Sequence, residues 1–150
     1  TASDELRELA HGVHPAILSR GGLRPALRDL GRRAPLPVEV DVDVPARLPQ
    51  AVEIAAYYTV AEALTNAAKH AQASVVTVHV DTDATSLRIT VTDDGVGGAA
   101  LDAGSGLLGL EDRVAALGGK LRLSSTAGVG TTLVAEMPLK ETAVAGTDGS

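Results

Sequence analysis

Hydrophobic residues recur along this chain with two different periods, and the two periods predict different elements. Alternation of apolar with polar residues is typical of half-buried strands, whereas apolar residues three or four positions apart are typical of amphipathic helices. Helices are expected over residues 3–30, with an interruption at Pro15, and over residues 50–70 and 107–117. Strands are expected over residues 38–44, 76–80, 87–91, 120–125 and 131–137, the second and third forming a hairpin.

The helix expected over residues 50–70 has two distinct sides. Its core side is predicted to consist of Ile54, Tyr58, Ala61, Thr65 and Ala68. A separate polar row, at positions i, i+4, i+7 and i+8, consists of Glu62, Asn66, Lys69 and His70. Such a row usually marks a solvated helix face, but it can also face a polar ligand.

The strand expected over residues 87–91 runs into an acidic glycine turn formed by Asp93, Asp94, Gly95, Val96 and Gly97. A carboxylate fixed at a strand end can accept a hydrogen bond from the N6 amine of adenine and would repel the carbonyl oxygen of guanine. Asp93 could therefore select ATP over GTP, while Gly95 and Gly97 let the backbone approach a flat base. The simpler alternative is that Asp93 caps the turn, and Asp94 is expected to be only a turn residue.

A second glycine cluster opens the helix expected over residues 107–117. It consists of Gly104, Ser105, Gly106, Leu107, Leu108 and Gly109. Backbone N–H groups at a helix start favour phosphate, and the small residues 98–103 before the cluster are typical of a lid over a triphosphate. A dinucleotide fingerprint is rejected, because no buried strand directly precedes this cluster and residues 124–130 contain no acid.

Three side chains of the polar row are candidates for phosphate and metal chemistry. Asn66 offers a neutral oxygen suited to a magnesium ion that keeps several waters. Lys69 is expected either to neutralise phosphate or to be solvated. Glu62 is expected either to pair within the helix face or to act as a base or orienting carboxylate beside the γ-phosphate.

Composition narrows the possible classes of function. The chain has 150 residues, a formal charge of −6, no Cys and 45% hydrophobic residues. The acidic balance argues against nucleic acid as a partner, and the lack of Cys excludes disulfides and cysteine zinc sites. No apolar run approaches the roughly 20 residues of a membrane span, so we expect no membrane contact by this chain. A cytoplasmic location is expected, although the parent protein could be membrane-attached.

The order of these motifs resembles the catalytic ATP-binding domain of bacterial sensor histidine kinases. The matching segments are residues 62–70, 93–97, 104–110 and 130–132. The resemblance implies a two-layer α/β sandwich of the Bergerat (GHKL) type, in which helices cover one face of a mixed, mostly antiparallel sheet. It implies ATP and Mg²⁺ as cofactors, with magnesium at Asn66 and adenine at Asp93. Phosphate contacts would come from Lys69, His70 and the second glycine cluster, and Thr131 would support the adenine end.

The resemblance also implies how the parent protein is divided. Residues 36–140 are similar to the catalytic domain, residues 1–35 to the last helix and linker of a dimerisation and phosphotransfer domain, and residues 141–150 are expected to be a disordered tail. The double acid and the sequence of residues 111–114 are most similar to the nitrate/nitrite-sensor-like subfamily. The acceptor histidine is expected in a preceding helix outside this chain, because His11 and His14 do not match the acceptor pattern.

The hypothesis from the sequence is a histidine kinase catalytic domain that transfers the γ-phosphate of ATP to a histidine on the acceptor helix of the same kinase dimer. A response regulator would then receive the phosphoryl group. Two alternatives stay open. One is a serine kinase or ATPase of the same fold, such as an anti-sigma factor, and the other is a nucleotide-binding module without phosphotransfer.

Overall fold

A computed structural model of the chain describes residues 16–68, 74–95, 107–126 and 130–139. Its helices are α2 (Ala16–Gly21), α3 (Leu23–Arg33), α4 (Gln50–Asn66) and α5 (Leu107–Ala116). Its strands are β1 (Val38–Asp43), β2 (Val76–Thr82), β3 (Ser86–Asp93), β4 (Lys120–Thr126) and β5 (Gly130–Pro138). The helix expected over residues 3–15 and the tail expected over residues 141–150 lie outside the described residues.

The strands form one five-stranded sheet in the order β1-β2-β3-β5-β4. β1 pairs in parallel with β2, and every other neighbouring pair is antiparallel. The expected strands and the expected hairpin of β2 with β3 are therefore confirmed. Alternation gives the sheet one apolar and one polar face. On β2, for example, Val76 and Val78 are fully buried and Thr77 between them is exposed.

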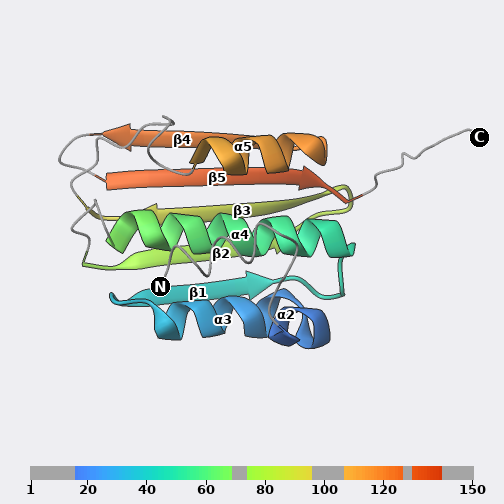
Figure 1. The fold of residues 1–150 in the computed structure, drawn as a ribbon, viewed down its shortest axis with the longest axis horizontal. Helices are drawn as coiled ribbons and strands as arrows, with labels where there is room; N and C mark the ends of the chain where they lie inside the picture. The colour runs from blue at the N-terminus through green and yellow to red at the C-terminus, as the bar shows by residue number, and fades with distance from the viewer. Residues whose placement is uncertain (1–15, 69–73, 96–106, 127–129, 140–150) are drawn as a thin grey trace, which may run out of the picture.

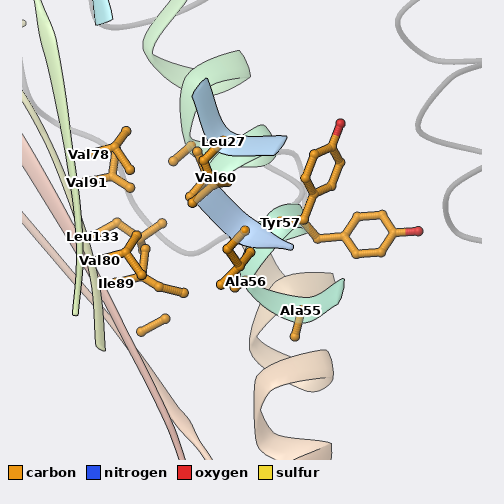
Figure 2. Packing of buried hydrophobic residues seen from close by; sticks show 14 of the residues in the cluster. Leu27, Ala55, Ala56, Tyr57, Val60, Val78, Val80, Ile89, Val91 and Leu133 are labelled. Carbon is orange, nitrogen blue, oxygen red and sulfur yellow. The ribbon is translucent and has the colours of Figure 1, made fainter. Parts of the chain in front are cut away.

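Helices cover the apolar face, so the predicted two-layer α/β sandwich is also confirmed (Figure 1). α4 lies over the middle of the sheet, α5 over β4 and β5, and α3 beside β1 (Figure 1). Figure 2 shows Val60 of α4 facing the sheet side chains Val78 and Val91, whereas the ring of Tyr57 points away from the sheet. None of the described helices is long and apolar enough to cross a membrane.

The predicted core side of α4 is wrong. Of its five residues only Tyr58 is buried, Ile54, Ala61 and Thr65 are half-buried, and Ala68 is exposed. The buried stripe of α4 instead includes Ala56, Val60 and Ala63, and continues into Ala67, the residue that follows the helix. The physical reason is that α4 contacts α3 and α5 as well as the sheet, so apolar residues surround most of the helix. Spacing alone therefore does not show which side meets the sheet.

α2 and α3 pack in the same core as the sheet. Leu18 of α2 and Leu23 and Leu27 of α3 are buried together with residues of α4 and the strands. Arg24 of α3 donates a hydrogen bond of 2.7 Å to the carbonyl oxygen of Val42 in β1. The domain boundary near residue 35 concerns the parent protein and stays a prediction. Within the described chain, residues 16–33 pack on the sheet that follows them.

A buried carboxylate joins α2 to the start of α4. Glu53, whose side chain is 4% exposed, accepts hydrogen bonds from Arg47 at 2.8 and 2.9 Å and from the Leu48 N–H at 3.1 Å. Arg47 also donates to the carbonyl oxygen of Ser19 at 3.3 Å, near the C-terminal end of α2. The guanidinium of Arg47 therefore neutralises the desolvated Glu53 carboxylate and also donates to the end of α2, where carbonyl oxygens lack partners within the helix. A cavity of about 240 Å³ lies beside this pair.

We predict that Arg47→Met lowers the melting temperature by about 5–10 °C, because it leaves the Glu53 carboxylate buried with one remaining donor. The matched control is Arg88→Met. Arg88 makes an ion pair of the same length, 2.8 Å, and its side chain is equally exposed, at 53%, but its partner Glu136 is 34% exposed. That variant should stay within about 2 °C of the parent chain. Equal shifts in thermal unfolding would show that burial of Glu53 does not matter.

Candidate functional site

Described parts of the three predicted motif segments lie toward the same end of the sandwich (Figure 1). α4 ends there at Asn66 and β3 ends there at Asp93, whereas α5 begins at Leu107, set back from that end, with its N-terminal end directed toward it. β5 starts at the same end, where Thr131 lies in register with Asp93. Seven other residues predicted for the site lie outside the described residues. They are Lys69, His70, Val96, Gly97, Gly104, Ser105 and Gly106.

Asp93 is held between two strands at the last position of β3. Its Cα pairs with Val76 of β2 on one side and with Thr131 of β5 on the other. One carboxylate oxygen, Oδ1, accepts a hydrogen bond of 2.9 Å from the Gly95 N–H. This oxygen therefore caps the turn, as the simpler alternative from the sequence predicts. The second oxygen, Oδ2, has no hydrogen-bond partner within the described part of the chain. A carboxylate with one oxygen held and the other available can bind an amine donor.

Gly130 allows β5 to pack closely against the end of β3. Its φ of 139° is one that side chains rarely adopt, and a Cβ at this position would lie 2.3 Å from the carbonyl oxygen of Asp93. Only glycine fits such an approach. The next residue, Thr131, has its Oγ1 3.0 Å from Oγ of Ser125 in β4. The register of β3 and β5 pairs Thr131 with Asp93, and the supporting role of Thr131 at the adenine end stays a prediction.

Asp94 has a partner that local sequence did not indicate. Its carboxylate accepts hydrogen bonds from the backbone N–H groups of Ser74 and Val75, at 2.8 and 3.1 Å, and from the Ser74 hydroxyl. The hydroxyl and the two N–H groups hold the pKa of Asp94 below its usual value, with the Ser74 side chain as the largest cause. The expectation of a mere turn residue missed this contact because Ser74 is 20 positions away.

Asn66 and Glu62 both lie near the C-terminal end of α4. Asn66 is the last residue of the helix and is half-buried, as is Glu62 one turn earlier. A π-type turn over residues 67–68 follows, in which the Ala67 N–H is shared between two carbonyl oxygens. Such turns often occur at functional sites. The described residues contain no group of three His, Cys, Asp or Glu side chains that could hold a metal ion.

α5 is attached to α4 by a cation–π contact. The Cζ atom of Arg113 lies 4.1 Å from the centre of the Tyr58 ring. Burial raises the pKa of Tyr58, and the charge of Arg113 partly opposes that effect. Because Tyr58, Glu62 and Asn66 are four residues apart, they follow one side of α4. The contact therefore fixes the helix that starts at Leu107 against the same side of α4 that carries Asn66.

The chain matches the family model described as "Histidine kinase-, DNA gyrase B-, and HSP90-like ATPase" over residues 51–141. It is 32% identical to the sensor histidine kinase NarS of Mycobacterium tuberculosis over 93% of this chain and 35% of NarS. It is 30% identical to the sensor histidine kinase LiaS of Bacillus subtilis over 92% of this chain and 40% of LiaS. The chain thus spans little more than a third of the length of these curated relatives.

A solved histidine kinase structure is also similar to this chain. The blue-light-activated histidine kinase of Erythrobacter litoralis aligns with a TM-score of 0.67 and 25% sequence identity. The alignment covers 81% of this chain and 42% of that kinase. The sandwich described above is therefore the fold that this kinase also contains.

We predict that Gly130→Ala lowers the free energy of unfolding by about 2–4 kcal/mol. The new Cβ would clash with the Asp93 backbone, and alanine would have to adopt a φ that side chains rarely adopt. Gly109→Ala is the control. Gly109 lies in α5, and a Cβ there would meet nothing within 4 Å. That substitution should stabilise the fold by up to about 1 kcal/mol, since Ala favours helix over Gly. Denaturant unfolding without nucleotide measures both, and equal effects would contradict the close approach at Gly130.

Proposed function

We propose that this chain, which belongs to the histidine kinase-, DNA gyrase B- and HSP90-like ATPase family, is the catalytic domain of a sensor histidine kinase. It binds ATP with Mg²⁺ and transfers the γ-phosphoryl group to a histidine on the acceptor helix of the same kinase dimer. A response regulator in the cytoplasm receives the group next. The observation that carries the proposal is that α4 and β3 end, at Asn66 and Asp93, at the same end of the sandwich, toward which the start of α5 is also directed (Figure 1).

Asp93 reads the base in this proposal. The support is that the Gly95 N–H occupies Oδ1, while Oδ2, which has no hydrogen-bond partner among the described residues, is proposed to accept the N6 amine of adenine. β2 and β5 hold the strand end from both sides, so the carboxylate direction is set before nucleotide arrives. Thr131, in register with Asp93, supports the same end of the nucleotide.

Asn66 is the proposed magnesium ligand. A neutral amide oxygen at a half-buried helix end fits an ion that keeps water and takes its other ligands from phosphate oxygens. When bound, Mg²⁺ supplies neutralisation of the charge that develops on the phosphates. Lys69, His70 and the backbone N–H groups of residues 104–109 are proposed as the phosphate contacts, with Gly95, Val96 and Gly97 lining the base.

Glu62 is proposed as the base or orienting carboxylate for the attacking histidine. It lies one helical turn before Asn66, on the side of α4 that Arg113 and Tyr58 also occupy. In the transfer, a ring nitrogen of the histidine bonds to the γ-phosphorus as the bond to the bridging oxygen of ADP breaks. Most of the rate would come from positioning and charge neutralisation by this set of residues.

Phosphotransfer is tested by mixing the chain with γ-labelled ATP, Mg²⁺ and a dimeric fragment that carries the acceptor helix of the parent kinase. We expect acid-labile, alkali-stable label on that fragment, because phosphohistidine has this stability. An acceptor in which the histidine is replaced by Gln gives the background, and Asn66→Ala should reduce the label to it. Tight ATP binding without acid-labile label would favour the nucleotide-binding module, and acid-stable label on serine would favour a serine kinase.

Base recognition is tested with Asp93→Ala. We expect ATP affinity to fall by about 1.5–3 kcal/mol, roughly 10- to 150-fold, because a charge-assisted hydrogen bond to N6 is lost. Purine riboside triphosphate, which carries only hydrogen at position 6, is the control ligand, and its affinity should change by less than about 3-fold. Calorimetry would contradict the assignment if both nucleotides lost the same affinity or neither did.

A further inference from the structure

Asp93 and Asp94 are neighbours in sequence, but their carboxylates bind different parts of the chain. Asp93 caps its own turn at Gly95. Asp94 reaches across to Ser74 and Val75, which directly precede β2, and accepts two backbone N–H groups and one hydroxyl there. Its contact therefore spans the gap between the end of β3 and the start of β2.

This contact begins where the strand pairing stops. The ladder between β2 and β3 ends at the pair Val76 and Asp93. Beyond that pair the Asp94 side chain takes the place of further ladder hydrogen bonds, because it binds the N–H groups of the two residues before Val76. On the opposite side, Gly130 packs against the Asp93 carbonyl oxygen. The backbone of Asp93 is thus held by β5 on one flank, and on the other by the terminal pair with Val76 and by the Asp94 contact just beyond it.

We propose that Asp94 is a positioning residue that directs the Asp93 carboxylate and thereby sets the preference of this site for adenine. This inference rests on the proposed function, in which Asp93 binds N6. Without the contact to residues 74–75, the β2 flank of Asp93 is held only by the last ladder pair, with Val76, so this flank frays more easily. The Asp93 carboxylate then samples directions in which Oδ2 misses the amine. A ligand without that amine gains nothing from the alignment, so its affinity is insensitive to Asp94.

The chain offers a closely matched control at the other end of the same strand pair. Asp83 accepts the N–H groups of Thr85 and Ser86 at 2.8 and 2.9 Å, together with their hydroxyls. Like Asp94 it is an exposed carboxylate whose hydrogen bonds hold its pKa below the usual value. Removing the side chain of either Asp83 or Asp94 leaves two backbone N–H groups without their carboxylate acceptor. Only Asp94 adjoins Asp93.

The experiment measures the affinities of ATP and purine riboside triphosphate by calorimetry for the parent chain and three variants, Asp94→Ala, Asp94→Asn and Asp83→Ala. We expect Asp94→Ala to reduce the ratio of the two affinities by about 5-fold or more while the purine riboside affinity changes by less than about 2-fold. Asp94→Asn, which keeps one acceptor oxygen, should restore part of the ratio. Asp83→Ala should leave the ratio unchanged.

An unchanged ratio in Asp94→Ala would overturn the proposal, because a role in stability alone would resemble that of Asp83. If that variant does not fold, Ser74→Ala carries the test. It removes only the hydroxyl donor and should reduce the ratio by about 2-fold; an unchanged ratio there would overturn the proposal in the same way. Failure of the proposed function gives a different result: the parent chain itself would then show no preference for ATP, and Asp93→Ala would change nothing.

Discussion

The parallel pairing of β1 with β2 is the constraint on which the arrangement of this molecule depends. Parallel neighbours need a connection that carries the chain back to the starting end of the sheet, and α4 is that connection. Its last residue, Asn66, therefore arrives at the end where β2 starts. β3 is antiparallel to β2 and so finishes at the same end, at Asp93. Topology alone thus brings the amide of Asn66 and the carboxylate of Asp93, which are distant in the sequence, to the same end of the sheet.

β5, which lies between β3 and β4, adds its first residues to the same end of the sheet. β5 is antiparallel to β3, so its first residues, Gly130 and Thr131, meet the last residue of β3. The close backbone approach at Gly130 and the side-chain cap from Asp94 then restrict one strand end from two directions. A carboxylate restricted in this way loses little freedom when it binds a ligand, which is the physical basis of preorganised recognition.

Much of the fold could be predicted from the sequence, because its signals are local. Alternation along residues 76–80 and 87–91 predicts a hairpin without knowledge of any partner, and the structure contains it. The buried side of α4 could not be predicted in the same way, since α2, α3, α5 and the sheet all contact this helix and its apolar residues surround it. The contacts of Glu53 with Arg47 and of Asp94 with Ser74 also escaped prediction. Charged residues near turns are usually solvated, and only the tertiary fold shows which of them are desolvated or capped.

The two halves of the proposed site are held by different kinds of contact, which follows from their different tasks. Reading a base depends on direction, and Asp93 receives its direction from strand pairing and backbone caps. Binding a triphosphate depends on the distance between Asn66 at the end of α4, the proposed metal ligand, and the N–H groups proposed to contact phosphate, of which those of residues 107–109 belong to α5. That distance is set by packing between the two helices, where Leu110 and Val114 are buried and Arg113 stacks on Tyr58. The ring of Tyr58 lies on the side of α4 that also carries Asn66, so the contact fixes α5 directly relative to the proposed metal ligand, with no intervening strand. A substitution that loosens the end of β3 would therefore affect base selection first. A substitution that loosens the packing between α4 and α5 would affect phosphate binding first.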